Sequence, residues 1–335
     1  MKDIRLSIIV PGYGNPEPRW HRCIRSILKN MGPTDELICI DDASPQTPEF
    51  LLEYARKDSR VQILLEKTNR GASLTRKYGM SLAKGRYITF VDDDDELLEG
   101  TYDAALKSIA MEQADIAIFG VRSVWEAERL WKVNVAKKDC FLSTEMEKVV
   151  RLYKNSLLNY VWNKVYDHEF LKRNAIEFDP KGAQCEDMIF NISCLLAKPK
   201  MVTVEHVGMV YFRTHTSLLS CYKPNFREGA EICNAAWREY KQSNPNGLAF
   251  WGMLGEMSEG DLLHSEWDNL WRLRSPKSLR ERFEFLKSHP ALTRGHSPYY
   301  VFVMRVVYTV LRRWFYITPV QRWHIKRMYP DVKPL

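Results

Sequence analysis

Residues Arg86–Gly100, RYITFVDDDDELLEG, join an apolar segment directly to four consecutive carboxylates. Tyr87–Val91 is almost continuously apolar, which predicts a buried strand. Asp92–Asp95 follow it without a break. Adjacent carboxylates repel one another, so this strand end destabilises the fold unless a cation or a hydrogen-bonding ligand compensates. The stretch therefore predicts a buried strand that delivers acidic side chains to a ligand.

The four aspartates are expected to divide into two pairs. Alternate residues of an extended chain point the same way, so Asp92 and Asp94 can face one ligand while Asp93 and Asp95 face away or cap the next helix. Carboxylate oxygens without nearby His or Cys suit Mg²⁺ or Mn²⁺, and such sites often use substrate phosphates as further ligands. This predicts a metal that bridges the protein to a diphosphate. The alternative is an acidic loop that caps a helix from Gly100 or stays solvated.

The surrounding sequence predicts a parallel α/β sheet. Apolar runs separated by helical patterns argue for parallel strands that are covered on both faces. Ligands bind beyond the carboxyl ends of such strands. The polar or turn-forming clusters Pro11–Tyr13, Asp41–Asp42 and Asp92–Asp95 are therefore expected to meet at one edge. The runs are LSIIV (6–10), ELICID (36–41), VQILLE (61–66), YITFV (87–91) and DIAIFG (115–120).

The remaining sequence is mixed and then helical. Residues 182–197 predict a helix that opens on acidic residues, and MVTVEHVGMVYFRT (201–214) predicts a strand pair. From about 225 to 290 the chain is helical and rich in Trp. A boundary is expected near Tyr222–Asn225.

The basic residues are concentrated at the C-terminal end of the sequence, and the cysteine pattern indicates the redox state of the thiols. The net charge of +7 comes from 49 basic and 42 acidic residues, and residues 291–335 hold eight Arg or Lys and one acid, Asp331. The seven cysteines include no CxxC pair, which indicates reduced thiols in a cytosolic protein. The first apolar run is too short for the core of a signal peptide.

Six segments, taken in order, resemble the motifs of the inverting family-2 glycosyltransferases, which have the GT-A fold. The resemblance covers roughly residues 6–219 and implies a Rossmann-like, mostly parallel central sheet with flanking helices. It implies a catalytic domain over 1–222, with a nucleotide-sugar-binding half (1–120) and an acceptor-binding half (121–222). A helical C-terminal region (223–335) with a basic aromatic tail (291–335) follows. The segments are LSIIVPGYGN (6–15), LICIDDASPQT (37–47), NRGASLTRKYG (69–79), YITFVDDDDEL (87–97), VWNKVYDHEF (161–170) and CEDMIFN (185–191).

The resemblance implies a role for each matching residue. On the donor side, Asp42 contacts the nucleotide base, Arg76 lies near the phosphates or supports the aspartates, and Asp94 ligates Mn²⁺ or Mg²⁺. Asp187 is the general base that deprotonates the acceptor hydroxyl. The other residues implied on the donor side are Pro11 and Tyr13, which line the base pocket, and Asp92 and Asp93, which hold ribose, sugar or metal-bound water.

Weaker matches suggest residues that bind or support the acceptor: Trp162, Lys164, Glu186, Arg213 and His215. The alternative for Glu186 and Asp187 is that they occupy a first helical turn, where acids are favoured. The alternative for Arg213 and His215 is a solvated loop. Gly14 interrupts the family's Tyr-Asn pair before Asn15, which leaves the fine shape of the donor pocket open.

The tail, residues 291–335, has two interpretations. Arg305 and the pair Arg312–Arg313 interrupt the apolar run, so this segment cannot easily span a bilayer. On a helix these arginines share one face, and the remainder is apolar and aromatic, as in helices that lie in an anionic membrane interface. The alternative is a helix that packs on the catalytic domain. No nucleic-acid-binding motif accompanies the basic residues.

The resemblance implies an enzyme that moves one sugar from a nucleotide-diphosphate sugar, with a UDP-sugar expected, to a hydroxyl of a glycan or lipid-linked oligosaccharide. It is expected in the cytoplasm, peripherally on the inner face of the cytoplasmic membrane. One alternative is a metal-dependent nucleotidyltransferase, which would need a Gly- and Lys-rich loop near the first strand. The other is a non-catalytic membrane-associated scaffold, against which the intact Asp94 and Asp187 argue.

Overall fold

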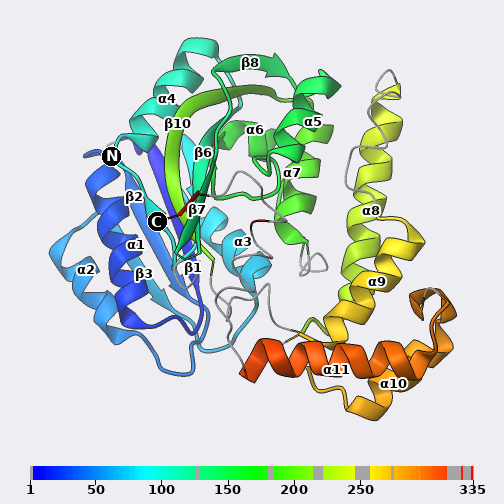
Figure 1. The fold of residues 1–335 in the computed structure, drawn as a ribbon. Helices are drawn as coiled ribbons and strands as arrows, with labels where there is room; N and C mark the ends of the chain where they lie inside the picture. Colours follow the sequence, from blue (N-terminus) through cyan, green and yellow to red (C-terminus); the bar gives the residue numbers. More distant parts are fainter. Residues whose placement is uncertain are drawn as a thin grey trace. The chain divides into compact units, whose positions relative to one another are not determined.

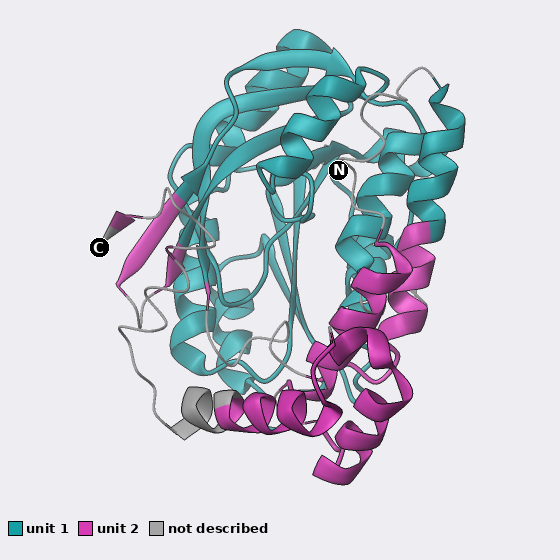
Figure 2. Ribbon diagram, turned by 45° about the vertical axis from the view of Figure 1, so that its right-hand side comes forward, with its two compact units in different colours: residues 1–123, 133–212, 235–255 teal, residues 124–132, 213–234, 256–335 magenta. Residues whose placement is uncertain are grey.

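A computed structural model describes residues 3–125, 129–179, 185–213, 222–245, 257–272, 275–293, 295–314, 326 and 333–334. The chain forms two compact units, coloured separately in Figure 2. Unit 1 comprises residues 1–123, 133–212 and 235–255, and unit 2 comprises residues 124–132, 213–234 and 256–335. The division expected at residue 222 remains a prediction.

Four strands of unit 1 form the parallel part of its sheet (Figure 1). Its parallel strands are β1 (Leu6–Gly12), β2 (Glu36–Asp41), β3 (Val61–Leu65) and β4 (Tyr87–Phe90). β1 pairs in parallel with β2 and with β4, and β2 pairs in parallel with β3. Every residue of β1 and β4 is buried, as expected for strands with both faces covered. The predicted parallel arrangement is confirmed for these four of the five predicted runs.

Antiparallel strands extend this sheet. β9 (Lys164–Asp167) pairs with β4 on one side and with β6 (Ile116–Trp125) on the other, which gives the order β6-β9-β4-β1-β2-β3. β10 (Lys200–Phe212) pairs with β8 (Asp139–Leu142) and with β5 (Glu96–Leu97). The sheet is therefore mixed.

The strand pair expected over residues 201–214 is wrong, because β10 is one continuous strand. Gly208, which lies within this strand, serves close packing. A Cβ atom at Gly208 would lie 2.4 Å from the Phe119 ring and 2.6 Å from the Thr101 methyl group. The glycine therefore lets β10 approach its neighbours.

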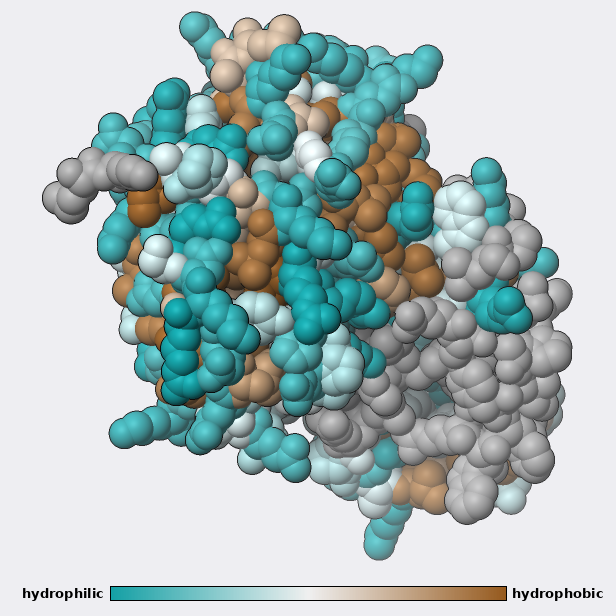
Figure 3. Space-filling model, turned by 90° about the vertical axis from the view of Figure 1, so that its left-hand side faces the viewer, coloured by the Kyte–Doolittle hydropathy of each residue, from teal (hydrophilic) through white to brown (hydrophobic). Residues whose placement is uncertain are grey.

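Helices flank the sheet of unit 1 (Figure 1). α1 (Glu17–Asn30) buries Trp20, Cys23, Ile24 and Ile27, which follow the helical period. The others are α2 (Leu52–Lys57), α3 (Ala72–Leu82), α4 (Thr101–Glu112), α5 (Met146–Lys154), α6 (His168–Arg173) and α7 (Glu186–Leu196). The face drawn in Figure 3 is largely hydrophilic, with apolar residues visible between the polar ones.

Unit 2 is mainly helical, as the sequence predicted. α8 (Phe226–Ser243) begins in it, and α9 (Glu259–Leu270), α10 (Leu279–Ser288), a 3₁₀ turn (Pro290–Thr293) and α11 (Pro298–Trp314) follow. Its core contains Trp267, Trp271, Leu286 and Leu292. β7 (Leu130–Asn134) pairs through its unit 2 residues with β11 (Lys333–Pro334). No helix formed by the described residues is both long enough and apolar enough to cross a membrane.

Candidate functional site

The carboxyl ends of β1, β2 and β4 meet at one edge of the sheet. The Asp42 N–H donates to the Gly12 carbonyl at 2.9 Å, which joins the ends of β2 and β1. A Cβ atom at Gly12 would lie 2.5 Å from the Asp93 carboxylate, so the end of β4 is also in contact. Gly12 therefore leaves the space in which the acidic segment sits beside β1.

Asp42, the residue expected to contact the nucleotide base, binds backbone groups in this structure. Its two carboxylate oxygens accept hydrogen bonds from the Arg70 N–H at 2.9 Å and the Gly71 N–H at 2.8 Å. These bonds fix the turn that leads into α3. Pro11 is buried, whereas Tyr13 is exposed. The base-binding roles of Pro11, Tyr13 and Asp42 remain predictions.

The four aspartates form a turn that we call the acid turn, Asp92–Asp95. The Asp95 N–H donates to the Asp92 carbonyl at 3.1 Å, a bond between residues i+3 and i of a β-turn. Asp93 and Asp95 are buried, whereas Asp92 and Asp94 are partly exposed, which is the alternation predicted from the sequence. Only the first and third carboxylates are therefore open to a ligand.

The two buried carboxylates of the acid turn hold it in place. Asp93 Oδ1 accepts from Asn15 Nδ2 at 2.7 Å, and Asp95 Oδ1 accepts from the Phe212 N–H at 3.1 Å. Asp95 thereby links the turn to the end of β10. The donor contact predicted for Asp93 remains a prediction.

The acid turn carries more negative charge than the described cations offset. Burial, followed by the charge of Asp92, raises the pKa of Asp94 to about 6, although Arg19 lies 3.9 Å from its carboxylate. Burial and the charge of Asp94 raise the pKa values of Asp93 and Asp95 well above the usual range. One oxygen each of Asp93 and Asp95 has no hydrogen-bond partner among the described residues. An added cation would therefore stabilise this turn.

The acid turn fits a metal only if other ligands come from outside the described protein. Within the described ranges, no group of three or more His, Cys, Asp and Glu side chains is arranged to enclose a metal ion. Asp94 offers a partly exposed carboxylate, and hard oxygen ligands suit Mg²⁺ or Mn²⁺. Such a metal would need oxygens from water or from a diphosphate.

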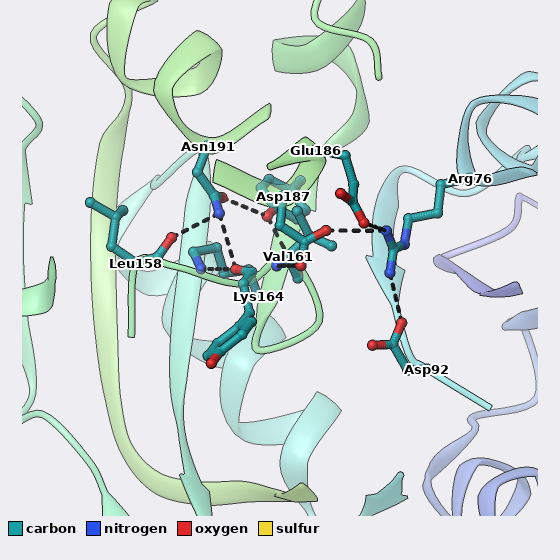
Figure 4. Close-up of polar contacts among 10 residues, drawn as sticks. Arg76, Asp92, Leu158, Val161, Lys164, Glu186, Asp187 and Asn191 are labelled. Carbon is teal, nitrogen blue, oxygen red and sulfur yellow. Dashed lines mark hydrogen bonds and ion pairs between the residues drawn. The ribbon is translucent and has the colours of Figure 1, made fainter. Parts of the chain in front are cut away.

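Arg76 of α3 connects the acid turn to α7 (Figure 4). Its guanidinium lies 2.8 Å from Asp92, 3.1 Å from Asp187 and 3.5 Å from Glu186, and its side chain is 5% exposed. Burial lowers the pKa of Arg76, but the charges of Asp187, Asp92 and Glu186 outweigh this and raise it. The guanidinium therefore stays charged between three carboxylates.

Asp187 lies in the first turn of α7 with both carboxylate oxygens in defined contacts (Figure 4). Oδ1 faces Arg76, and Oδ2 accepts from the Val161 N–H at 3.4 Å. Burial above all, opposed by Arg76 and reinforced by Glu186 and Asp92, raises the pKa of Asp187 to about 7. Its side chain remains 17% exposed. A carboxylate with these properties suits a general base near neutral pH.

The weaker candidates fall in different places. Lys164 is buried and binds carbonyl oxygens, and Trp162 is buried in a stack with Tyr160, with ring centroids 4.6 Å apart. Arg213 belongs to unit 2, where its guanidinium lies over the Trp125 ring. His215 lies outside the described residues. Glu186 lies beside Arg76. The acceptor roles of these five residues remain predictions.

Sequence reasoning missed the residues that support the acid turn. Asn15 holds Asp93, Arg19 faces Asp94, and Arg22 donates to the Asp94 carbonyl at 2.7 Å. Arg19 and Arg22 lie three residues apart on α1 and therefore on one helix face. This spacing is the feature of the sequence that could have indicated them. It also missed Asn191, which lies four residues after Asp187 and therefore on the same face of α7.

The chain is similar to known proteins over this region. Residues 7–173 match the family described as "Glycosyl transferase family 2". An uncharacterized glycosyltransferase of Bacillus subtilis, EpsJ, is 29% identical over 227 residues, which are 67% of this chain and 65% of that protein. The poly(ribitol-phosphate) beta-N-acetylglucosaminyltransferase TarP of Staphylococcus aureus is 31% identical over 57% of this chain and 58% of its own length. The chain thus spans less than two thirds of each relative.

A solved structure supports the fold. The crystal structure of S. aureus TarS 1-349 in complex with UDP-GlcNAc superposes with a TM-score of 0.60 at 16% identity, and the match covers 84% of each chain. At this identity the likeness concerns the fold alone. The mixed α/β sheet of unit 1 is accordingly a GT-A-like fold. From the family match and this fold together, the chain belongs to glycosyltransferase family 2.

Proposed function

We propose that this protein is an inverting glycosyltransferase that moves one sugar from a nucleotide-diphosphate sugar to an acceptor hydroxyl, with Asp187 as the general base. The observation that carries the proposal is the position of Arg76, which binds both Asp92 of the acid turn and Asp187 of α7. A candidate donor-side carboxylate and a candidate base therefore share one cation. A UDP-sugar is the proposed donor, because TarS was crystallised with UDP-GlcNAc.

The proposed reaction is a single displacement. The acceptor oxygen forms a bond to the anomeric carbon, the bond from that carbon to the diphosphate oxygen breaks, and the acceptor proton passes to the Asp187 carboxylate. Arg76 keeps Asp187 oriented, and the raised pKa of Asp187, about 7, favours proton uptake near neutral pH. No covalent enzyme nucleophile is needed, so the anomeric configuration inverts.

A divalent metal is part of the proposal. Asp94 would hold Mn²⁺ or Mg²⁺, with Asp92 beside it, because these are the two partly exposed carboxylates of the acid turn. When bound, such a metal stabilises the charge that grows on the leaving nucleoside diphosphate.

The acceptor is proposed to be a surface glycan or a lipid-linked oligosaccharide. TarP is named for poly(ribitol-phosphate), and another relative, GgaB of B. subtilis, is named for minor teichoic acid biosynthesis. We propose a cytoplasmic protein that lies peripherally on an anionic membrane through α11. Tyr299, Tyr300, Val303, Met304 and Val307 of that helix are exposed.

The test is product release by purified full-length protein. With Mn²⁺ or Mg²⁺ present, we expect slow release of the nucleoside diphosphate from one member of a panel containing UDP-glucose, UDP-GlcNAc and GDP-mannose. Asp187→Asn should abolish release but retain donor binding in calorimetry. Asp139→Asn, at a carboxylate of β8 that pairs with Lys148, is the matched control and should behave as wild type.

Two results would overturn the proposal. Wild-type turnover by Asp187→Asn would show that this carboxylate is not the base. Release of pyrophosphate from a nucleoside triphosphate and a sugar phosphate, with no turnover of any nucleotide sugar, would identify a nucleotidyltransferase instead.

A further inference from the structure

The loop Leu157–Val161 is held by four buried side chains that bind its backbone carbonyl groups. We name this set the loop clamp. Each of its members is at most 2% exposed. The loop clamp consists of Asn163, Lys164, Tyr166 and Asn191.

Lys164 makes three hydrogen bonds within the loop clamp. Its Nζ donates to the Leu157 carbonyl at 2.9 Å, to Asn163 Oδ1 at 2.8 Å and also to the Tyr160 carbonyl. An ammonium group has three hydrogens, and here each has an acceptor. Asn163 Nδ2 donates to the same Leu157 carbonyl at 2.9 Å. The start of the loop is therefore tied directly to β9.

Asn191, which is labelled in Figure 4, and Tyr166 hold the rest of the loop. Asn191 Nδ2 donates to the Leu158 carbonyl at 2.8 Å and to the Tyr160 carbonyl at 3.1 Å. The Tyr166 hydroxyl lies 3.2 Å from Asn191 Oδ1 and 3.4 Å from the Val161 carbonyl. Contacts from both β9 and α7 thus fix the loop as far as Val161.

The loop in turn binds Asp187. The Val161 N–H donates to Asp187 Oδ2, and Asp187 and Asn191 lie four residues apart on one face of α7. α7 therefore contacts the loop twice, through a base that accepts from it and an amide that donates to it. Arg76 binds the other oxygen of Asp187, Oδ1. The hydrogen bond from the loop to Oδ2 therefore fixes the orientation of this carboxylate.

We propose that the loop clamp positions Asp187 for proton transfer, with Lys164 as its principal positioning residue. This inference rests on the proposed function, because it takes Asp187 as the base. The clamp binds the carbonyl groups of the loop, and the Val161 N–H of that loop binds Asp187, so the clamp acts on the acceptor proton through Val161 and Asp187.

The chemistry of Lys164 supports a role beyond filling the core. Burying an ammonium group costs free energy that an apolar side chain of similar length would avoid. The charged groups that face Asp187 are Arg76 from α3, Glu186 from α7, Asp92 from the acid turn and Lys164 from β9. Burial lowers the pKa of Lys164 to about 7, and the charge of Asp187 opposes this. A positive charge on Lys164 therefore favours the ionised, proton-accepting form of Asp187.

The test compares Lys164→Met with Lys148→Met, which removes a surface lysine of α5 that pairs with Asp139 and Glu145. The readout is nucleoside diphosphate release from the donor identified in the panel above. For Lys164→Met we expect kcat to fall about tenfold to a hundredfold, with the donor KM within about twofold of wild type. The acidic limb of the pH–rate profile should move to higher pH, because the loss of a positive charge makes Asp187 harder to ionise. Lys148→Met should change neither.

A second, more conservative pair of variants tests the same proposal if Lys164→Met fails to fold. Tyr166→Phe removes one hydroxyl from the clamp, and Tyr102→Phe makes the same change at a buried tyrosine of α4 that makes none of the loop contacts. We expect kcat to fall about threefold to tenfold in Tyr166→Phe alone, at unchanged donor KM.

The failures of the two proposals are distinguishable. If Asp187→Asn is inactive while Tyr166→Phe and any folded Lys164→Met keep the wild-type kcat and acidic limb, the clamp has no role in catalysis. If the variants lose donor affinity in proportion to rate, the clamp only stabilises the fold. If Asp187→Asn is active, the proposed function itself fails.

Discussion

Arg76 Nη1 lies 3.1 Å from Asp187 Oδ1, although 111 positions separate the two residues in the chain. The same guanidinium donates to Asp92 at 2.8 Å. The guanidinium is buried, whereas the Asp92 and Asp187 side chains are 29% and 17% exposed, so each ion pair is only partly shielded from solvent. Arg76 therefore connects the acid turn to the candidate base on α7.

Replacing Arg76 with Met should damage both the acid turn and the first turn of α7. Its loss leaves the carboxylates of Asp92, Glu186 and Asp187 close together without their shared cation. We expect the free energy of unfolding to fall on the order of 3 kcal/mol. The acidic limb of the rate profile should also move to higher pH, because Arg76 opposes the raised pKa of Asp187. Chemical denaturation and pH–rate measurements on the same samples check both effects.

Arg56→Met is the control for this change. Arg56 pairs with Glu53 on the surface of α2, where ion pairs contribute little. A stability change in Arg76→Met no larger than that in Arg56→Met would contradict the proposed connection.

The sequence predicted the elements around the acid turn well. The apolar run before Asp92 is a buried strand, and alternate aspartates are buried as predicted, although Asp92–Asp95 form a β-turn and not an extended strand. Arg76, placed by resemblance near the phosphates or the aspartates, does bind Asp92. Both successes concern features that a local pattern or a quoted motif contains.

The parts that could not be predicted depend on contacts between distant residues. The bond from the Phe212 N–H to Asp95 joins residues 117 positions apart, and no local pattern indicates it. The continuous strand β10 was predicted as a strand pair, and the space that Gly208 leaves within it is filled by Phe119 of another strand. The residues of the loop clamp likewise bind one loop only because the fold brings β9 and α7 together there.

The pH dependence of turnover should report Asp187. Its pKa is raised to about 7, and a general base must be ionised to accept a proton. kcat/KM should therefore rise with pH through a limb near 7 and level off above it. A rate that is flat from about pH 5 to 8, at constant fold and metal occupancy, would exclude a base with this pKa.

Asp94→Asn should make the protein more stable and less active. The folded-state pKa of Asp94, about 6, exceeds its ordinary value of 3.8, so between these values the folded state binds more protons than the unfolded state. The contribution of Asp94 to stability therefore falls as pH rises through this window. At pH 7 the neutral amide should increase the free energy of unfolding by on the order of 2 kcal/mol. Mn²⁺-dependent donor binding should be lost.

Asp103→Asn controls for the change of charge. Asp103 is exposed on α4 and pairs only loosely with Arg5, at 3.4 Å. It should leave both stability and Mn²⁺ dependence near wild type. If Asp94→Asn binds the donor as tightly as wild type in Mn²⁺, the metal does not depend on this carboxylate.

The membrane proposal predicts that the exposed stripe of α11 controls liposome binding. Tyr299, Val303 and Val307 are four residues apart and therefore lie on one face of the helix. The triple change of these residues to Ser should strongly reduce cosedimentation with vesicles of phosphatidylglycerol and phosphatidylcholine. Met111→Ser, at an exposed apolar residue of α4, should not.

The described contacts of α11 show why the apolar stripe, and not Arg305, should carry this binding. Arg305 lies 2.8 Å from Asp268 of α9 and over the Trp271 ring, so its charge is already paired within unit 2. Phe302 packs against the core of the same unit. Arg305→Gln should consequently have a larger effect on the stability of unit 2 than on vesicle binding. If Arg305→Gln abolishes cosedimentation while the triple variant retains it, the helix binds membranes through charge, and the apolar face has another use.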